Sequence, residues 1–236
     1  MPSDVKRLAA DLASAPQASA LVGISADHIQ AMDRLQRVNF VNSLSGFKSA
    51  NLVGTVSETG ATNLAIVSSV VHLGADPPLM GMVTRPRSVE RHTVENILAT
   101  GVFTLNHVHT GIVKASHQTA ARYPREQSEF EQVGLTPYYS LGHAAPYVAE
   151  SRLSIGLKLR ECKHLDINDT DFLIGEVVQV LVLPEAVTAD GFIDLQALGT
   201  VAVSGLDSYH RTERLGRLRY PKPDSAPEWM ASPLAG

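Results

Sequence analysis

Two long runs of alternating side chains, joined by a short turn, constrain the fold more than any other feature. In SRLSIGLKLREC, residues 151–162, an aliphatic residue occupies every second position from Leu153 to Leu159. This period of two is typical of a strand with one buried face. The second run, DFLIGEVVQVLVL at 171–183, follows the turn NDTD, so the two runs are predicted to be adjacent strands.

Shorter apolar runs bounded by turn residues predict five further strands. They are SANLVGTVS at 49–57, TNLAIVSSVVHLGADPP at 62–78, LMGMVT at 79–84, VFTLNHV at 102–108 and GTVAVSGL at 199–206. Regular short strands separated by turns are typical of a barrel or sandwich. We therefore expect a mainly β fold with peripheral helices, an antiparallel barrel closed on itself so that no strand edge is exposed.

Five segments are predicted to be helical: 27–44, 92–101, 110–123, 128–134 and the basic stretch 209–220. The first carries an apolar stripe at three-residue steps, which indicates packing. In the second, Thr93 is a candidate cap and Gly101 a stop. In the fourth, Ser128 and Glu131 have the spacing of a capping box, with Gly134 as the stop.

Composition limits the classes of function. A formal charge of −4 and a pI near 6.1 give no general attraction to nucleic acid or anionic lipid. The single cysteine, Cys162, excludes an internal disulfide and every multi-cysteine metal site, so we expect a reducing cytoplasm. No run of roughly 18 apolar residues is present, and no membrane association is expected.

Several well-known motifs are absent. No Gly-x-Gly-x-x-Gly turn follows a strand, and no Gly-x-Ser-x-Gly elbow is present. His107 and His109 are spaced as metal ligands often are, but no third ligand is evident, so we predict no metal site and read them as a strand end. Cys162 has no cysteine neighbour and is interpreted as a buried thiol.

One segment has the composition of an anion site. TRPRSVERHTVEN, residues 84–96, brings Arg85, Arg87 and Arg91 to the start of a predicted helix, with Ser88 and Thr93 as hydroxyl donors. The first amides of a helix are free to bind an anion, and the planar guanidinium forks suit a phosphate. The alternative is an ordinary solvated loop.

The predicted strand at 62–78 carries polar residues that a barrel wall does not need. Asn63, Ser68 and Ser69 would line a groove continuous with the arginine segment if the strand leads to the barrel rim. Such a groove suits a phosphorylated, ring-bearing cofactor. The alternative is that the local backbone satisfies these polar groups.

The order of three segments resembles the flavin reductase-like family with an FMN-binding split barrel. They are TGATNLAIVSSVVHLGADPPLMGMV, RPRSVERHTVENILATGVFTLN and HQTAARYPREQSEFEQVGLTP. The resemblance covers roughly 28–223. It implies an N-terminal arm of residues 1–27, one split-barrel domain over 28–223 and a C-terminal tail of 224–236.

The resemblance also implies a homodimer with FMN held non-covalently at the subunit interface. By position, three groups of residues match the family's cofactor-binding segments. The strand and turn beside the flavin are matched by Asn63, Ser68 and Ser69. The segment that supports the phosphate is matched by Arg91, His92 and Thr93. A helix that approaches the flavin is matched by His117, and Arg85 is a further candidate.

A bound flavin accepts hydride at N5 from a nicotinamide, so no catalytic side chain is assigned. We expect an NADH- or NADPH-dependent reductase whose reduced flavin either leaves the protein or passes electrons on, with a monooxygenase or another acceptor protein as the partner. One alternative is a flavoredoxin-like carrier that is reduced by a protein partner. Another is a barrel that binds no flavin and serves as an interaction module.

Overall fold

The computed structural model describes residues 21–86 and 91–230 of the 236-residue chain. The chain separates into two compact units. One is Val41–Thr212, and the other combines Met1–Phe40 with Glu213–Gly236. No helix in the described ranges is long and apolar enough to cross a membrane.

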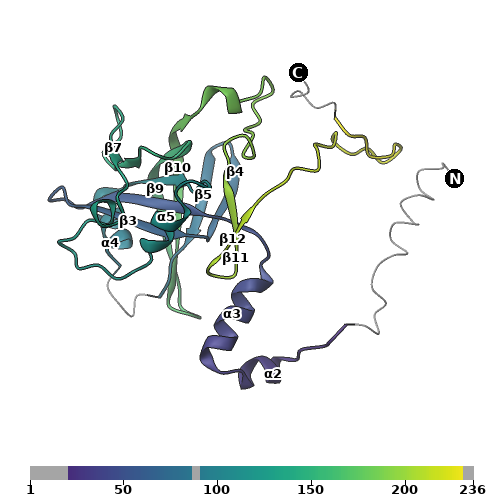
Figure 1. The fold of residues 1–236 in the computed structure, drawn as a ribbon, viewed down its shortest axis with the longest axis horizontal. Coiled ribbons are helices and arrows are strands. Elements are labelled where there is room, and N and C mark those ends of the chain that lie inside the picture. Colours follow the sequence, from purple (N-terminus) through teal and green to yellow (C-terminus); the bar gives the residue numbers. More distant parts are fainter. Residues whose placement is uncertain (1–20, 87–90, 231–236) are drawn as a thin grey trace. The chain divides into compact units, whose positions relative to one another are not determined.

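Seven strands of the larger unit form one sheet in the order β3-β2-β6-β9-β10-β5-β4, and every neighbouring pair is antiparallel. Five of them, β3, β9, β10, β5 and β4, are labelled in Figure 1. The strands are β2 (Asn51–Val56), β3 (Thr62–Val67), β4 (Val70–Ala75), β5 (Pro78–Val83), β6 (Val102–His107), β9 (Leu153–Leu165) and β10 (Thr170–Val182). The mainly β, antiparallel fold predicted from the sequence is confirmed.

The two alternating runs are adjacent strands, as predicted. Strands β9 and β10 have 13 residues each and form the longest hairpin of the sheet. Asp169 in the connecting turn has a φ of 56°, a left-handed conformation that short polar side chains tolerate best. The alternation thus places Leu153, Ile155 and Leu157 in the core.

The segment 62–78 is not one strand. It divides into β3 and β4 at Ser68 and Ser69, and these two strands lie at opposite ends of the sheet. The Ser69 side chain donates to the Val83 carbonyl at 2.5 Å, which ties the start of β4 to β5. The two end strands of the sheet, β3 and β4, pair only with β2 and β5 among the described strands. The backbone hydrogen bonds between β3 and β4 that would close the barrel are therefore not seen.

The larger unit also contains short strands and helices. These are β1 (Lys48–Ser49), β7 (Pro137–Tyr138), β8 (Tyr147–Val148), β11 (Val201–Ser204), β12 (Ser208–Arg211), α4 (His92–Thr100), α5 (Val113–Gln118), α6 (Glu129–Val133) and the 3-10 turn η2 (Pro184–Ala186). Gly101 and Gly134 end α4 and α6 with φ values of 72° and 70°, as predicted.

One predicted helix cap is wrong, and another has the predicted residue without the predicted hydrogen bond. Arg91 is the N-cap of α4 and Ser128 that of α6, and neither side chain forms a capping hydrogen bond. Thr93 instead donates to Asn63, and Ser128 exchanges a hydrogen bond with Thr62. Tertiary partners on β3 therefore displace the local caps.

The sheet is buried on both faces at β2. Leu52 and Val53 are both fully buried but belong to different apolar clusters, because neighbouring residues of a strand point to opposite faces. Phe130 of α6 packs in the cluster of Leu52, and Ile97 of α4 packs in that of Val53. The two helices are thus held on opposite sides of the same strand.

Two predicted helices differ from the structure. The predicted helix at 27–44 is broken into α2 (Ala26–Ala31) and α3 (Arg34–Leu44). Asp33 interrupts it, since its carboxylate accepts from the Gln36 amide at 2.9 Å and begins a new helix. The predicted helix at 209–220 is absent, because its first residues pair with β11 as part of β12 and the rest is irregular.

Candidate functional site

Asn63 on β3 is the centre of a buried polar network. Its side chain is 7% exposed, and Oδ1 accepts from the hydroxyls of Thr93 at 2.7 Å and Thr55 at 3.4 Å. Its amide donates to the carboxylate of Glu129 at 2.8 Å. These bonds occupy the side chain of Asn63 and hold the first turn of α4 against β3.

The edge strand β3 is protected by side chains from two helical segments. The outward amides of Leu64 and Ile66 donate to Glu129 at 3.0 Å and to Thr119 at 2.9 Å. Glu129 is 6% exposed, and its two donors compensate the burial of its carboxylate. Sequence reasoning missed both acceptors, although Glu129 stands directly after the residue that we read as a local cap.

Three arginines gather at the start of α4. Burial lowers the pKa of the Arg91 guanidinium, and the positive charges of Arg85 and Arg122 lower it further. The Nε of Arg91 donates to the Pro86 carbonyl at 3.4 Å. The predicted pair of Arg85 and Arg91 is therefore close in space, whereas Arg87 lies outside the described residues.

The third arginine was missed by sequence reasoning. Arg122 follows α5 in an exposed, irregular segment, and nothing in its sequence neighbourhood indicates an anion site. Its charge reaches Arg91 only because α5 packs against β3, the strand to which Thr93 ties α4. Among the described residues, neither Arg85 nor Arg122 forms an ion pair.

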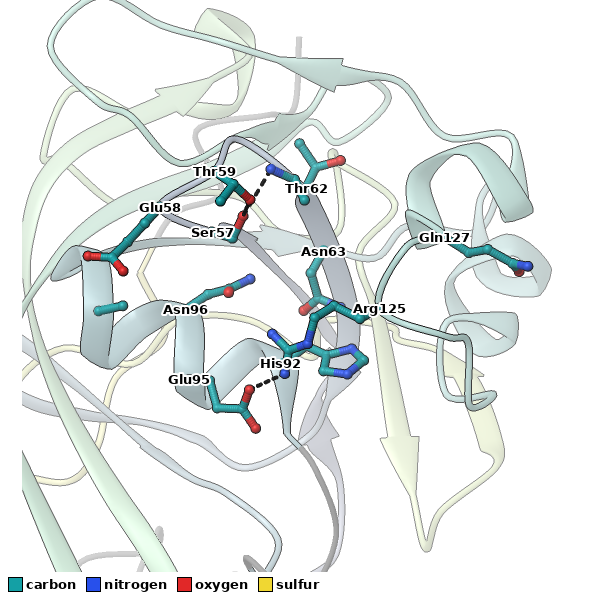
Figure 2. A pocket seen from close by; sticks show the side chains of 12 residues that line it. Ser57, Glu58, Thr59, Thr62, Asn63, His92, Glu95, Asn96, Arg125 and Gln127 are labelled. Carbon is teal, nitrogen blue, oxygen red and sulfur yellow. Dashed lines mark hydrogen bonds and ion pairs between the residues drawn. The ribbon is translucent and has the colours of Figure 1, made fainter.

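A cavity of about 320 Å³ lies between α4 and the turn that joins β2 to β3 (Figure 2). We call it the α4 cavity. It is lined by Ser57, Glu58, Thr59, Ala61, Thr62, Asn63, His92, Glu95, Asn96, Ala99, Arg125 and Gln127. Of the predicted site residues, Asn63 and His92 line it.

One ion pair stands in the wall of the α4 cavity. Arg125 forms an ion pair with Glu95, and this hydrogen bond is the main cause of the lowered pKa of the Glu95 carboxyl (Figure 2). The backbone amide of Arg91 donates to the other carboxylate oxygen at 3.1 Å and lowers this pKa too. Glu95 thus links the arginine cluster to the cavity.

His117 on α5 is exposed and has an aromatic partner. Its Nδ1 is 3.0 Å from the hydroxyl of Tyr209 on β12, and the two rings meet edge to face with centroids 5.7 Å apart. Burial raises the pKa of the Tyr209 hydroxyl, which therefore stays protonated and able to donate at neutral pH. The pair holds the imidazole in one orientation.

The structure therefore brings together some of the predicted residues. Asn63 and Thr93 are bonded, Arg85 and Arg91 are electrostatically coupled, and His92 shares the α4 cavity with Asn63. Ser68, Ser69 and His117 form no recorded bond with this group within the described chain. Ser68 is half-buried at the bend that follows β3, the strand from which Asn63 points.

The two histidines considered as metal ligands have different surroundings. Nδ1 of His109 accepts from the Gly111 amide at 3.1 Å, so its Nε2 carries the proton and donates to the Glu150 carbonyl at 3.0 Å. Burial lowers the pKa of His107 to about 4. In the described ranges, no group of three or more His, Cys, Asp or Glu side chains is arranged to hold a metal ion.

The arginine cluster suits a phosphate chemically. The positive charges of Arg85 and Arg122 lower the pKa of Arg91, which means that these guanidiniums repel, and an anion between them relieves that repulsion. The first amides of α4 add donors and the positive end of a helix dipole. The donor set at this end of α4 therefore fits a phosphoester such as that of a flavin nucleotide.

Comparison with known proteins identifies the fold and family. The model of the flavin reductase like domain matches residues 44–194. A proposed flavin reductase with a split barrel domain from Shewanella frigidimarina NCIMB 400 is 56% identical, with a TM-score of 0.83, and the match covers 85% of this chain and all of that one. Its split barrel agrees with the fold class predicted from the sequence.

Two other relatives are more distant. Nitrilotriacetate monooxygenase component B from Bacillus cereus is 24% identical, with a TM-score of 0.75 over 84% of this chain and 99% of that one. An uncharacterized protein of Aquifex aeolicus is 30% identical over 132 residues. The match covers 55% of this chain and 66% of that protein, which is just under two thirds of its length. On the match over 44–194 and the shared split barrel, the chain belongs to the flavin reductase-like domain family.

Proposed function

We propose that this protein is a flavin reductase that binds FMN non-covalently and uses NADH or NADPH as the electron donor. The observation that carries the proposal is the cluster of Arg85, Arg91 and Arg122 at the start of α4, which needs an anion to offset its repulsion. Membership of an oxidoreductase family supports the same chemistry.

The described residues have distinct parts in this proposal. Arg85 and Arg91 bind the phosphate, and the bond from Thr93 to Asn63 keeps the start of α4 in place beside them. Ser68 offers a hydroxyl at the end of β3, and Tyr209 orients the imidazole of His117. A bound flavin supplies the ring that accepts hydride, so the protein needs to bind and orient rather than to provide an acid or base.

We also propose that the protein is a homodimer. Strands β4, β5 and β10 share an apolar face on the side of Gly81. Three of its residues are partly exposed: Val71 by 47%, Leu73 by 42% and Val83 by 39%. The ring of Phe172 lies on the same face. An apolar sheet face that ends in an edge strand is an unfavourable surface to leave in water. A second copy of the chain would cover it, and sedimentation velocity would measure the dimer.

A reductase of this kind passes its electrons to another molecule. The similarity to a protein named as a monooxygenase component B supports a monooxygenase as the acceptor.

The test uses the purified protein loaded with FMN and dialysed. NADH and NADPH are added separately without oxygen, and at least one should bleach the yellow absorption of the bound flavin. Retained FMN that neither nicotinamide reduces would contradict the reductase and favour a carrier reduced by a protein. A protein that stays colourless with added FMN would contradict flavin binding altogether.

A matched pair of variants tests whether the arginine cluster at the start of α4 binds FMN. Arg91→Gln removes one charge of the cluster and should weaken FMN binding about tenfold, the equivalent of one charge-assisted hydrogen bond. Arg211→Gln, an exposed arginine of β12, should leave the affinity unchanged. Equal FMN affinity in the two variants would remove Arg91 from the site.

A further inference from the structure

The α4 cavity has the size of a small-molecule site. Ligand sites in proteins occupy about 300–1,000 Å³, and this cavity, at about 320 Å³, is at the lower end of the range. It therefore suits one half of a dinucleotide rather than a whole one. Ala61 and Ala99 contribute small apolar side chains, which leave the space open.

Several polar groups of the cavity wall are already satisfied. Asn63 uses its carboxamide in the buried network, Ser57 accepts from the Ala61 amide, and Thr62 is bonded to Ser128. These groups shape the wall and have little capacity left for a ligand.

Other groups of the wall remain available, and most are acceptors. Asn96 is 5% exposed and donates to Thr55 at 3.1 Å, whereas its Oδ1 accepts no hydrogen bond from the described residues. The carboxylate of Glu58 and the carboxamide of Gln127 likewise form no recorded side-chain bond with them. A ligand that satisfies this wall must bring hydroxyl or amino donors.

The opposite character is found where the cavity meets the start of α4. His92, the first residue of the helix, lines the cavity and directly follows Arg91 of the arginine cluster. Arg125 adds a guanidinium that Glu95 holds in the wall. Figure 2 shows His92 and Arg125 close together, with Glu58 in the turn on the other side of Asn96. Glu95 also lines the cavity and offsets the charge of Arg125, so the positive end of the α4 dipole at His92 is the feature that suits a phosphate, and donors suit the rest.

We propose that the α4 cavity binds an adenosine 5′-phosphate group. Its phosphate lies toward His92 at the start of α4, and its amino and hydroxyl groups donate to Asn96 and Glu58. This inference rests on the proposed function, because two of the molecules such a reductase handles carry this group: a flavin adenine dinucleotide and a nicotinamide dinucleotide.

The test begins with ADP and the flavin-free protein, measured by isothermal titration calorimetry. The unmodified protein should bind ADP. Ala99→Trp fills the cavity and should weaken binding at least about tenfold, as steric exclusion from a pocket does. Leu98→Trp places the same ring on the neighbouring exposed position of α4, outside the cavity lining, and should bind ADP like the unmodified protein.

A second variant checks the chemistry without changing the shape. Glu58→Gln keeps the size of the side chain and removes its charge, and it should weaken ADP binding about three- to tenfold, the cost of one hydrogen bond to a charged acceptor. No ADP binding by the unmodified protein, or equal affinities in the two tryptophan variants, would overturn the proposal.

Two further measurements identify the source of the adenosine phosphate. If it belongs to the flavin, FAD should bind about tenfold tighter than FMN, and Ala99→Trp should abolish this advantage. If it belongs to the nicotinamide, Ala99→Trp should raise the KM for NADH but not for reduced nicotinamide mononucleotide. FMN binding without either effect would overturn the adenosine site alone, whereas absent FMN binding would contradict the proposed function itself.

Discussion

Replacement of Glu129 tests how far the protein depends on its buried polar network. Its Oε2 accepts both from the Asn63 amide at 2.8 Å and from the Leu64 backbone amide at 3.0 Å. Glu129→Ala leaves two buried donors without a partner, each at a cost of about 1–3 kcal/mol. Water that enters the vacated space offsets part of this, so we expect a loss of about 3 kcal/mol in the free energy of unfolding.

Glu129→Gln separates the hydrogen bonds from the charge. Both donors use the same oxygen of Glu129, and the amide oxygen of glutamine can accept both. The loss is then only that of exchanging a charged for a neutral acceptor, about 1 kcal/mol. A stability between those of the unmodified protein and Glu129→Ala is therefore the expected result.

Urea unfolding followed by far-ultraviolet circular dichroism measures these losses. The sheet dominates that signal, whereas the single tryptophan, Trp229, belongs to the smaller unit. Glu131→Ala is the matched control, because Glu131 is an exposed residue of the same helix. It should change the free energy by less than about 0.5 kcal/mol. If Glu129→Ala were as stable as this control, the network would not support the fold and the reasoning would be refuted.

Three further predictions concern other parts of the larger unit. Burial lowers the pKa of His107 to about 4, below its value near 6.5 in the unfolded chain. The neutral ring therefore contributes its full stability above pH 6.5, and the free energy of unfolding decreases by about 3 kcal/mol as the pH falls to about 4. An NMR titration should show that the ring is still neutral at pH 5. Gly54→Ala should lower the melting temperature markedly, since the added carbon would stand 2.2 Å from the Pro146 carbonyl oxygen, whereas Gly74→Ala meets nothing nearer than 3.5 Å and should unfold close to the unmodified protein. Lys48→Met removes the ammonium group that donates to the carbonyls of Asn42 and Gly205, both at 3.0 Å. The free energy of unfolding in urea should fall by about 1–2 kcal/mol, and an unchanged unfolding midpoint would contradict this.

Features encoded by neighbouring residues were predictable from the sequence. The alternation from Leu153 to Leu159 specifies a strand whatever lies beside it, because side chains of a strand point to opposite faces in turn. Gly101 and Gly134 end their helices because a left-handed residue costs glycine least. The antiparallel fold class followed from these local signals and the turns between them.

The candidate site was only partly predictable. The arginines of residues 84–96 could be recognised as a candidate anion site because they are close in sequence and precede a helix. Arg122 could not, since its charge reaches Arg91 only through the packing of α5 on β3. Similarly, the spacing of Ser128 and Glu131 indicated a local cap, but β3 offered Ser128 a hydroxyl partner 66 positions away in the chain.

Taken alone, the amino-acid sequence determined the two long alternating strands, the stops of α4 and α6 and the family that the chain resembles, because these depend on residues within a few positions of one another. Tertiary structure decided that β3 and β4 lie at opposite ends of the sheet, that Glu129 and Thr119 protect an edge strand, and that α4 and the β2–β3 turn enclose a cavity. The physical reason is that a buried polar group bonds to whichever partner the packed chain brings within about 3 Å, and this partner need not be near in sequence.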